Sequence, residues 1–199
     1  MDERKASVKR ETRETKVSVE VNLDGNGQYT VSTGNGFFDH LLSQLSRHSL
    51  IDLTVKATGD AEQTGWHHTV EDVSIAVGRA LSEAIGEGRG IVRMGHALVP
   101  FDETLAQVAV DLSGRAYAVV DTAITDEMVE SMPSDLIRHS LESMAMEGKF
   151  NLNARVLAGQ NSHHKAEALF KALARSLKDA VSIDPRQGGE VPSTKGTIS

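Results

Sequence analysis

Two periods of hydrophobic and polar residues run along this chain, and together they predict strands and helices in alternation. Residues 15–23 and 50–57 alternate apolar and polar side chains, as half-buried strands do. Residues 67–85 instead repeat apolar side chains every three or four positions, which is typical of a helix with one buried face. The chain therefore combines strands with amphipathic helices.

The remaining segments follow the same two periods. Further helices are expected at residues 37–48, 134–147 and 163–181, and further strands at 92–99, 105–112, 116–122 and 150–158. The Asp-Gly-Asn-Gly sequence at 24–27 predicts a hairpin turn, from which residues 28–32 return as a strand.

The order of these elements repeats once. The segment DHLLSQLSRHSLIDLTVKATGD matches RHSLESMAMEGKFNLNARVLAG in its order of helix, strand and loop. Glycine-rich residues 86–90 separate a first half (1–90) from a second (91–183), and a Pro-, Gly- and Ser-rich tail follows at 184–199. We expect an α+β fold of duplicated halves, each a β-sheet with helices on one face. The two sheets are expected to pack together, in the layer order α/β/β/α.

Composition narrows the class of protein. The chain has 199 residues, 39% of them hydrophobic and 25% charged, which is ordinary for a globular protein. A net charge of -7 argues against nucleic acid as a partner. The sequence has no apolar run near the length of a membrane span, and its N-terminus lacks the apolar core of a signal peptide. With no cysteine, disulfides and thiolate metal sites are excluded, and a cytoplasmic location is expected.

One motif of metal-binding residue types occurs twice. In each half a single histidine, His40 or His139, precedes the sequence His-His-x-x-Glu by roughly 25 residues. A lone histidine is usually a surface or core residue, but two matched copies favour a pair of metal sites.

Helical spacing suggests how the ligands divide. Adjacent histidines on a helix point about 100° apart, whereas residues three or four apart share a face. This spacing pairs His67 with Glu71 and His164 with Glu167, and leaves His68 and His163 for different ions. The expected first set is His67, Glu71, His139 and His163, and the second is His40, His68, His164 and Glu167. Three imidazoles and one carboxylate suit Mn²⁺, Fe²⁺, Zn²⁺ or Ni²⁺.

Basic and hydroxyl side chains form a second candidate set. Arg93 and Arg115 begin predicted strands, Lys171 lies two helical turns after His163, and the tail contains Ser193-Thr194-Lys195-Gly196. Each alone is typical of a solvated surface, but the combination is common phosphate-binding chemistry.

The chain resembles the imidazoleglycerol-phosphate dehydratase family of histidine biosynthesis. The resemblance rests on RKASVKRETRETKVSVEVNLDG, GFFDHLLSQLSRH, HHTVEDVSIAVGRAL, PFDETLAQVAVDLSGRAY, NSHHKAEALFKALARSLKDA and VPSTKG. It implies a lyase that removes water from a phosphorylated imidazole substrate. It also implies two Mn²⁺ per active site, and sites at subunit contacts in a homo-oligomer of about 24 chains.

The resemblance also implies roles for individual residues. Glu14 becomes the mobile proton shuttle, with Glu71 and Glu167 as the other acid–base candidates. The implied substrate-binding set is Glu14, His40, Gln44, His48, His67, His68, Glu71, Arg93, Arg115, His163, His164, Glu167, Lys171, Ser193, Thr194 and Lys195. One departure concerns Gly65-Trp66, which stands where the family usually has Asp-Asp before the first His-His pair.

Two other classes of protein fit parts of the sequence. A different di-metal enzyme, such as a phosphoester hydrolase, usually bridges its ions with Asp-rich ligand sets, whereas these ligands are mostly imidazoles. A non-catalytic metal-binding assembly protein has no need for the basic set or the Ser-Thr-Lys tail.

Overall fold

The computed structural model describes residues 4–198 and contains two four-stranded sheets with matching strand orders. The first sheet has the order β1-β2-β4-β3 and the second β5-β6-β10-β7. In each sheet the last strand of this order runs parallel to its neighbour, and the other pairs are antiparallel. The shared topology confirms the predicted α+β class and the internal duplication.

The element bounds are as follows. The strands are β1 Lys5–Glu11, β2 Thr15–Asn22, β3 Tyr29–Ser32, β4 Asp52–Gly59, β5 Met94–Phe101, β6 Thr104–Asp111, β7 Tyr117–Asp121, β8 Met128–Val129, β9 Met132–Pro133 and β10 Asn151–Ala158. The helices are α1 Gly36–Ser49, α2 Ala61–Thr64, α3 His67–Ile85, α4 Asp135–Glu147, α5 Ser162–Val181 and the 3₁₀ turn η1 Pro185–Gln187.

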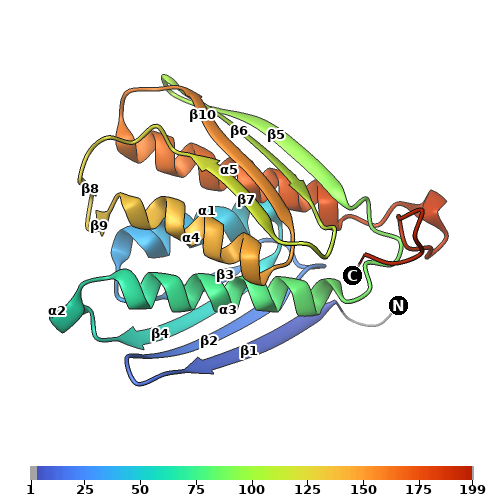
Figure 1. Ribbon diagram of the computed structural model, residues 1–199, viewed down its shortest axis with the longest axis horizontal. Coiled ribbons are helices and arrows are strands. Elements are labelled where there is room, and N and C mark those ends of the chain that lie inside the picture. The colour runs from blue at the N-terminus through green and yellow to red at the C-terminus, as the bar shows by residue number, and fades with distance from the viewer. Residues whose placement is uncertain (1–3, 199) are drawn as a thin grey trace.

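The four long helices lie between the two sheets (Figure 1). Helix α3 covers β1 and β2, and α5 covers β5 and β6, while α1 packs on α5 and α3 on α4. The predicted layer order α/β/β/α is therefore wrong, because the sheets are on the outside and the helices form the central layers. Alternating strands reveal one buried face each, but they do not reveal which layer lies outside.

Burial of the helices explains this arrangement. Helices α3 and α5 contact a sheet on one side and another helix on the other, so each is buried over more than one face. The residues that permit such close packing are small, and Ala76, Ala80, Ala168, Ala172 and Ser176 are fully buried. Each helix–helix contact joins the two halves, since α1 and α3 belong to the first half and their partners α5 and α4 to the second.

Two local expectations need correction. Residues 29–32 do form a strand, but β3 pairs in parallel with β4 instead of returning along β2 as a hairpin. Strand β1 was not predicted at all, because Lys and Arg mask its alternation. Its inward-facing Arg10 is tolerated because its Nε donates a hydrogen bond of 2.6 Å to buried Asp72.

Within residues 4–198, no helix is both long enough and apolar enough to cross a bilayer.

The contact between α3 and α4 depends on a glycine. A Cβ atom added at Gly78 would lie 2.5 Å from the backbone oxygen of Met144 and 2.8 Å from the backbone nitrogen of Gly148. Backbone atoms cannot move aside as a flexible side chain can, so Gly78 sets the distance between the two helices.

We predict that Gly78→Ala destabilises the protein although alanine favours helix. The free energy of unfolding should fall by about 1–3 kcal/mol, the usual cost of overpacking. Gly36→Ala is the control, because nothing lies within 4 Å of the added Cβ atom. Thermal or urea unfolding of both variants tests this, and a Gly78→Ala protein as stable as Gly36→Ala would contradict it.

Candidate active site

The first cluster of metal-binding residue types joins α3 to α4. His67 and Glu71 from α3 meet His139 from α4, with one ligand atom of each within 4.8 Å of the others. The rings of His67 and His139 stack with centroids 4.9 Å apart. Nε2 of His139 is buried and has no hydrogen-bond partner among the described residues. An imidazole nitrogen that makes no hydrogen bond and lies 3.3 Å from Oε1 of Glu71 is suited to bind a metal ion together with that carboxylate.

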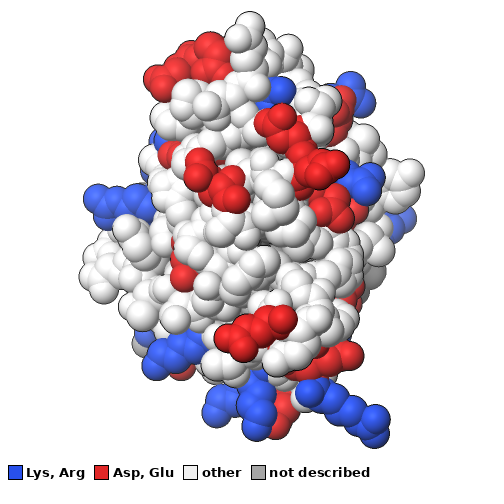
Figure 2. Space-filling model, turned by 90° about the vertical axis from the view of Figure 1, so that its left-hand side faces the viewer, with Lys and Arg blue, Asp and Glu red and all other residues white. Residues whose placement is uncertain are grey.

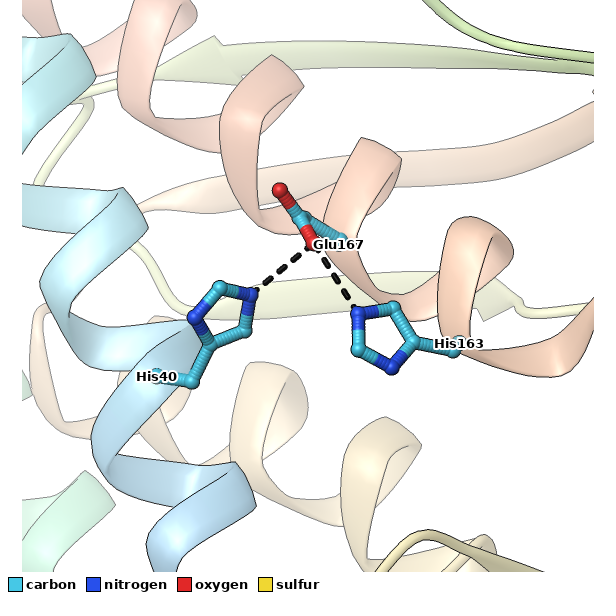
Figure 3. Close-up of side chains that lie close together, drawn as sticks. All are labelled: His40, His163 and Glu167. Carbon is cyan, nitrogen blue, oxygen red and sulfur yellow. Dashed lines mark hydrogen bonds and ion pairs between the residues drawn. The ribbon is translucent and has the colours of Figure 1, made fainter.

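The second cluster joins α1 to α5 and repeats the first (Figure 3). Oε2 of Glu167 lies 2.9 Å from Nε2 of His40 and 3.1 Å from Nε2 of His163. Phe37 lies beside both rings, 5.1 Å from the centroid of His163. Burial raises the pKa of Glu167, but Lys171 and His40 outweigh burial and lower this pKa to about 2. The carboxylate is therefore ionised at neutral pH.

The structure groups the ligands differently from the helical-spacing prediction. His67, Glu71 and His139 meet as expected, and so do His40 and Glu167. The expected pairing of His164 with Glu167 is wrong, because His163 occupies that place. Both histidines lie within one turn of Glu167, and the start of α5 decides between them. Asn161 caps the helix by accepting from the N–H groups of both histidines, and His163 then faces α1.

His68 and His164 lie outside both clusters and are held by carboxylates. Nδ1 of His68 lies 3.1 Å from Oδ2 of Asp60, and Nδ1 of His164 lies 2.7 Å from Oε2 of Glu103. The hydrogen bond to Asp60 raises the pKa of His68. Hydrogen bonds from the Asn161 backbone and from His164 hold the pKa of Glu103 far below its ordinary value.

Sequence reasoning missed these carboxylates, and it also missed Glu130. Oε1 of Glu130 lies 3.1 Å from Nδ1 of His163. All three acids lie outside the repeated His-His-x-x-Glu motif. Glu130 and Glu103 are also far in sequence from the histidines that they contact, by 33 and 61 residues. Acids that bind Nδ1 leave Nε2 of the same ring available to a metal.

A row of polar residues extends the second cluster along α1 and α5. Gln44 and His48 follow His40 at intervals of four on α1, and Lys171 follows Glu167 at the same interval on α5. Nε2 of His48 lies 3.0 Å from Oε1 of Gln44, and Nζ of Lys171 lies 2.7 Å from Oε1 of Glu167. Burial lowers the pKa of His48, and the positive charge of Lys171 adds to this effect. The predicted residues Gln44, His48 and Lys171 therefore lie beside the second cluster.

The first cluster has no such extension. The corresponding positions on α4 are Ser143 and Glu147, and the position on α3 that matches Lys171 is Ile75. Glu147 forms a 2.6 Å ion pair with Arg79 on α3. The duplicated clusters are therefore alike in their ligands and different in their surroundings.

The other basic candidates gather around a pocket of about 720 Å³. Its lining includes Arg93, Arg115, Ser193, Thr194 and Lys195. The guanidinium of Arg93 donates to both carboxylate oxygens of Asp111, at 2.7 and 3.1 Å. It also donates to the backbone oxygen of Pro192 at 2.9 Å, so that it fastens the tail. Three of its five N–H donors are thus used within the chain.

This pocket and the histidine clusters lie at opposite ends of the molecule. The backbone N–H of Arg93 donates to the carbonyl of Ala180, near the end of α5, whereas His163 begins that helix. The separation along the helix, residues 163 to 180, is about 25 Å at roughly 1.5 Å per residue. Figure 1 shows the tail at one end and the starts of α3 and α5 at the other. No single chain can bring the two sets together around a small substrate.

Acidic side chains predominate at the histidine end. Figure 2 shows that Asp and Glu spread over this face while Lys and Arg lie mainly at its margins. Asp60, Glu103 and Glu130 contribute to this charge and contact the histidines directly. Such a face attracts cations and opposes a phosphate.

Glu14 lies in the turn between β1 and β2, next to the start of α3. Its side chain is exposed, and its negative charge contributes to the raised pKa of His68. Asp72 of α3 holds the strands on both sides of this turn through Arg10 and Thr15. The turn is therefore fixed, while the Glu14 carboxylate has no hydrogen-bond partner within residues 4–198.

Gly65-Trp66 changes the start of α3 without removing a ligand. Trp66 occupies the N-cap position and offers no side-chain hydrogen bond, in contrast to Asn161 at the start of α5. Its indole is partly buried against the core, and a Cβ atom at Gly34 would lie 3.5 Å from it. An apolar contact thus replaces the cap that an acid would supply.

Comparisons with known proteins identify the family of this chain. A profile of the imidazoleglycerol-phosphate dehydratase family matches residues 33–177. The chain belongs to this family. It is 55% identical to the imidazoleglycerol-phosphate dehydratase of Dehalococcoides mccartyi, over 100% of this chain and 99% of the relative. It is 52% identical to that of Roseiflexus sp., over 98% of both chains.

Solved structures of family members have the same fold. The enzyme from Staphylococcus aureus superposes with a TM-score of 0.81 at 30% identity, covering 90% of this chain and 99% of that one. The enzyme from Pyrococcus furiosus, in complex with (S)-C348, also gives a TM-score of 0.81, at 32% identity and with coverage of 95% and 99%.

The two clusters predict that replacing His67 with Ala lowers metal binding by about one divalent ion per chain, because only the first cluster loses a ligand. His96→Ala is the matched control, since His96 is exposed on β5 and belongs to neither cluster. Metal analysis after loading with Mn²⁺ gives the stoichiometry. Equal metal content in the two variants would contradict a metal role for the first cluster.

Proposed function

We propose that this chain is a hydro-lyase that dehydrates imidazoleglycerol phosphate to imidazole-acetol phosphate in histidine biosynthesis. The observation that carries the proposal is the pair of matched His/Glu clusters at one end of the molecule. Membership of the dehydratase family supplies the substrate class. The full metal set proposed is His40, His67, His68, Glu71, His139, His163, His164 and Glu167.

Both clusters fit divalent transition metals, and Mn²⁺ is the proposed ion. Imidazole and carboxylate donors suit such ions, and the buried Nε2 of His139 has no hydrogen-bond partner in the described chain. When bound, two such ions would polarise the imidazole ring of the substrate through its nitrogens. His68 and His164 point their Nδ1 atoms at carboxylates and make no hydrogen bond through Nε2 within residues 4–198, so their Nε2 atoms are available to complete clusters on neighbouring chains.

The chain's own residues then bind the substrate and move its protons. The reaction removes a proton from one side-chain carbon and hydroxide from the ring-bearing carbon, and the resulting enol becomes the ketone. We assign proton transfer to Glu14, whose exposed carboxylate on a fixed turn can reach a substrate held beside α3. Glu71 and Glu167 are less free to act, because each lies within a metal cluster.

The phosphate is assigned to the opposite end of another copy of the chain. Arg115, Ser193, Thr194 and Lys195 offer it donors around one pocket, with Arg93 holding the tail in place. The histidine end supplies Gln44, His48 and Lys171. Because the histidine clusters lie about 25 Å from this pocket along α5, one site requires at least two chains.

The outer face of the second sheet is suited to such contacts. Met94, Leu98, Tyr117 and Leu157 are all more than half exposed on the strands of this sheet. Exposed apolar residues gathered on one sheet commonly mark a protein–protein interface. We therefore propose a closed homo-oligomer, for which the family resemblance implies about 24 chains.

A phosphoester hydrolase is the weaker alternative. Hydrolases of that kind usually bridge their ions with several aspartates, whereas each cluster here has two imidazoles and one glutamate.

Incubation of the Mn²⁺-loaded protein with imidazoleglycerol phosphate tests the proposal. The expected product is the ketone with its phosphate retained. Release of inorganic phosphate would instead favour hydrolysis, and metal uptake without any turnover would favour a non-catalytic protein.

Deleting residues 191–199 should impair binding of the substrate phosphate and spare the metals. We expect KM to rise at least about tenfold, as charge-assisted hydrogen bonds contribute about 1.5–3 kcal/mol each. The two clusters lie at the other end of the chain, so Mn²⁺ content should not change. Wild-type kinetics in the truncated enzyme would show that the tail does not contact the substrate.

Replacing Glu14 with Gln should remove the proton shuttle and retain binding. Glutamine keeps the size and hydrogen bonding of glutamate but lacks its basic carboxylate, so kcat should fall by roughly 10²–10⁴-fold. KM and bound Mn²⁺ should change much less, because Glu14 lies outside both clusters. Steady-state kinetics measure both parameters. A kcat within a few-fold of wild type would show that Glu14 is a solvated surface residue and not the proton shuttle.

A further inference from the structure

Glu14 has a structural counterpart in the second half, Glu103. The segment ETKVSVEVNLDG at 14–25 aligns without a gap to ETLAQVAVDLSG at 103–114, with Glu, Thr, Val, Val, Leu and Gly shared. In both segments the glutamate precedes the second strand of its sheet, β2 or β6. The following residues, Thr15 and Thr104, are each only 2% exposed, which shows that the two turns sit alike.

The two glutamates have opposite surroundings. The carboxylate of Glu14 has no hydrogen-bond partner within residues 4–198, whereas the carboxylate of Glu103 accepts several hydrogen bonds. Its Oε1 accepts from the backbone N–H groups of Asn161 at 2.8 Å and Gln160 at 3.0 Å. Its Oε2 lies 2.7 Å from Nδ1 of His164. Glu103 thus fixes the loop before α5 and the imidazole at the start of that helix.

The whole turn that carries Glu103 encloses His164. The ring of Phe101 meets the imidazole edge-on at a centroid distance of 4.8 Å. Oδ2 of Asp102 lies 3.7 Å from Nε2, beyond hydrogen-bonding distance. The only hydrogen bond that orients the His164 ring within residues 4–198 is therefore the one from Nδ1 to Glu103.

The first half performs the same task with a different residue. There Asp60, which follows Gly59 at the end of β4, lies 3.1 Å from Nδ1 of His68. The residue at the matching position after Gly159 is Gln160, which is neutral and lacks a carboxylate. The second half therefore has no acid at this loop position, and the glutamate of its strand turn contacts the histidine instead.

We propose that Glu103 is the positioning residue of His164, the fixed counterpart of Glu14. Its carboxylate accepts a hydrogen bond from Nδ1–H and so holds the ring in one orientation and one tautomer, with the lone pair of Nε2 directed outward to bind metal. One copy of the duplicated glutamate thus orders a ligand, and the other remains free to move protons. This inference rests on the proposed metal role of His164.

Glu103→Gln tests the proposal in the assembled, Mn²⁺-loaded enzyme. The glutamine oxygen can still accept from the loop, but its amide group donates toward Nδ1 and favours the tautomer with a proton on Nε2. The chelator concentration that removes half of the ion bound through His164 should fall roughly 10–100-fold, as for other residues that orient a ligand. Glu14→Gln, the same change at the matching position, should leave that concentration unaltered.

Two further measurements separate positioning from a merely structural role. Metal-free Glu103→Gln should unfold within a few degrees of the metal-free wild type, because its loop hydrogen bonds persist. In a chain that already carries His164→Ala, adding Glu103→Gln should weaken Mn²⁺ retention no further, since it acts only through His164. If Glu103→Gln fails to assemble, Glu103→Asp gives the same test, because it withdraws the carboxylate from Nδ1 by one methylene.

Each failure has a separate meaning. Wild-type Mn²⁺ retention in Glu103→Gln, or additive losses in the double variant, would overturn the positioning role. Wild-type retention in His164→Ala would instead overturn the proposed metal role of that histidine.

Discussion

The contact between helices of opposite halves determines the rest of this structure. Helix α1 packs on α5 and α4 on α3, in a layer that the two sheets enclose (Figure 1). Each contact joins one histidine from one half to a His/Glu pair from the other, as His139 meets His67 and Glu71. Neither half contains a complete cluster. The two halves therefore share the histidine clusters as well as the hydrophobic core.

The same helices keep two functional ends apart. The starts of α3 and α5 carry the histidines at an acidic face, and the end of α5 lies beside the basic pocket of the tail. The sites that we propose for the metal ions and for the phosphate lie at different ends, and their local charge differs in sign. A rigid helix of 20 residues prevents either end from approaching the other. The proposed active site therefore forms only where the end of one chain meets the opposite end of another.

The sequence predicts most elements of this fold because their periodicity is local. Helix α3 was expected at residues 67–85 and spans those residues. The position of β3 beside β4 could not be predicted, since parallel pairing depends on contacts between distant segments. The order of the layers could not be predicted from the hydrophobic pattern either. In sequence, a helix that small residues allow to be buried on two faces resembles an ordinary alanine-rich helix.

The candidate site was predictable in its residue types and less so in its grouping. The repeat identified the histidines, but spacings of three and four share a helical face, so the choice between His163 and His164 required the packing of α1 on α5. Asp60 and Glu103 support histidines in contacts that span 8 and 61 residues. No local pattern specifies such pairs, although the repeated Glu-Thr turn was a usable signal for Glu103.

Complementation between inactive chains tests the central claim most directly. One chain would carry His163→Ala at the histidine end, and the other Arg115→Ala with Lys195→Ala at the basic end. Each alone should be nearly inactive, but oligomers mixed in equal amounts should regain up to about a quarter of wild-type kcat, because random assembly joins two intact ends that often. Mixed oligomers that contain both chains and remain inactive would contradict an active site shared between subunits.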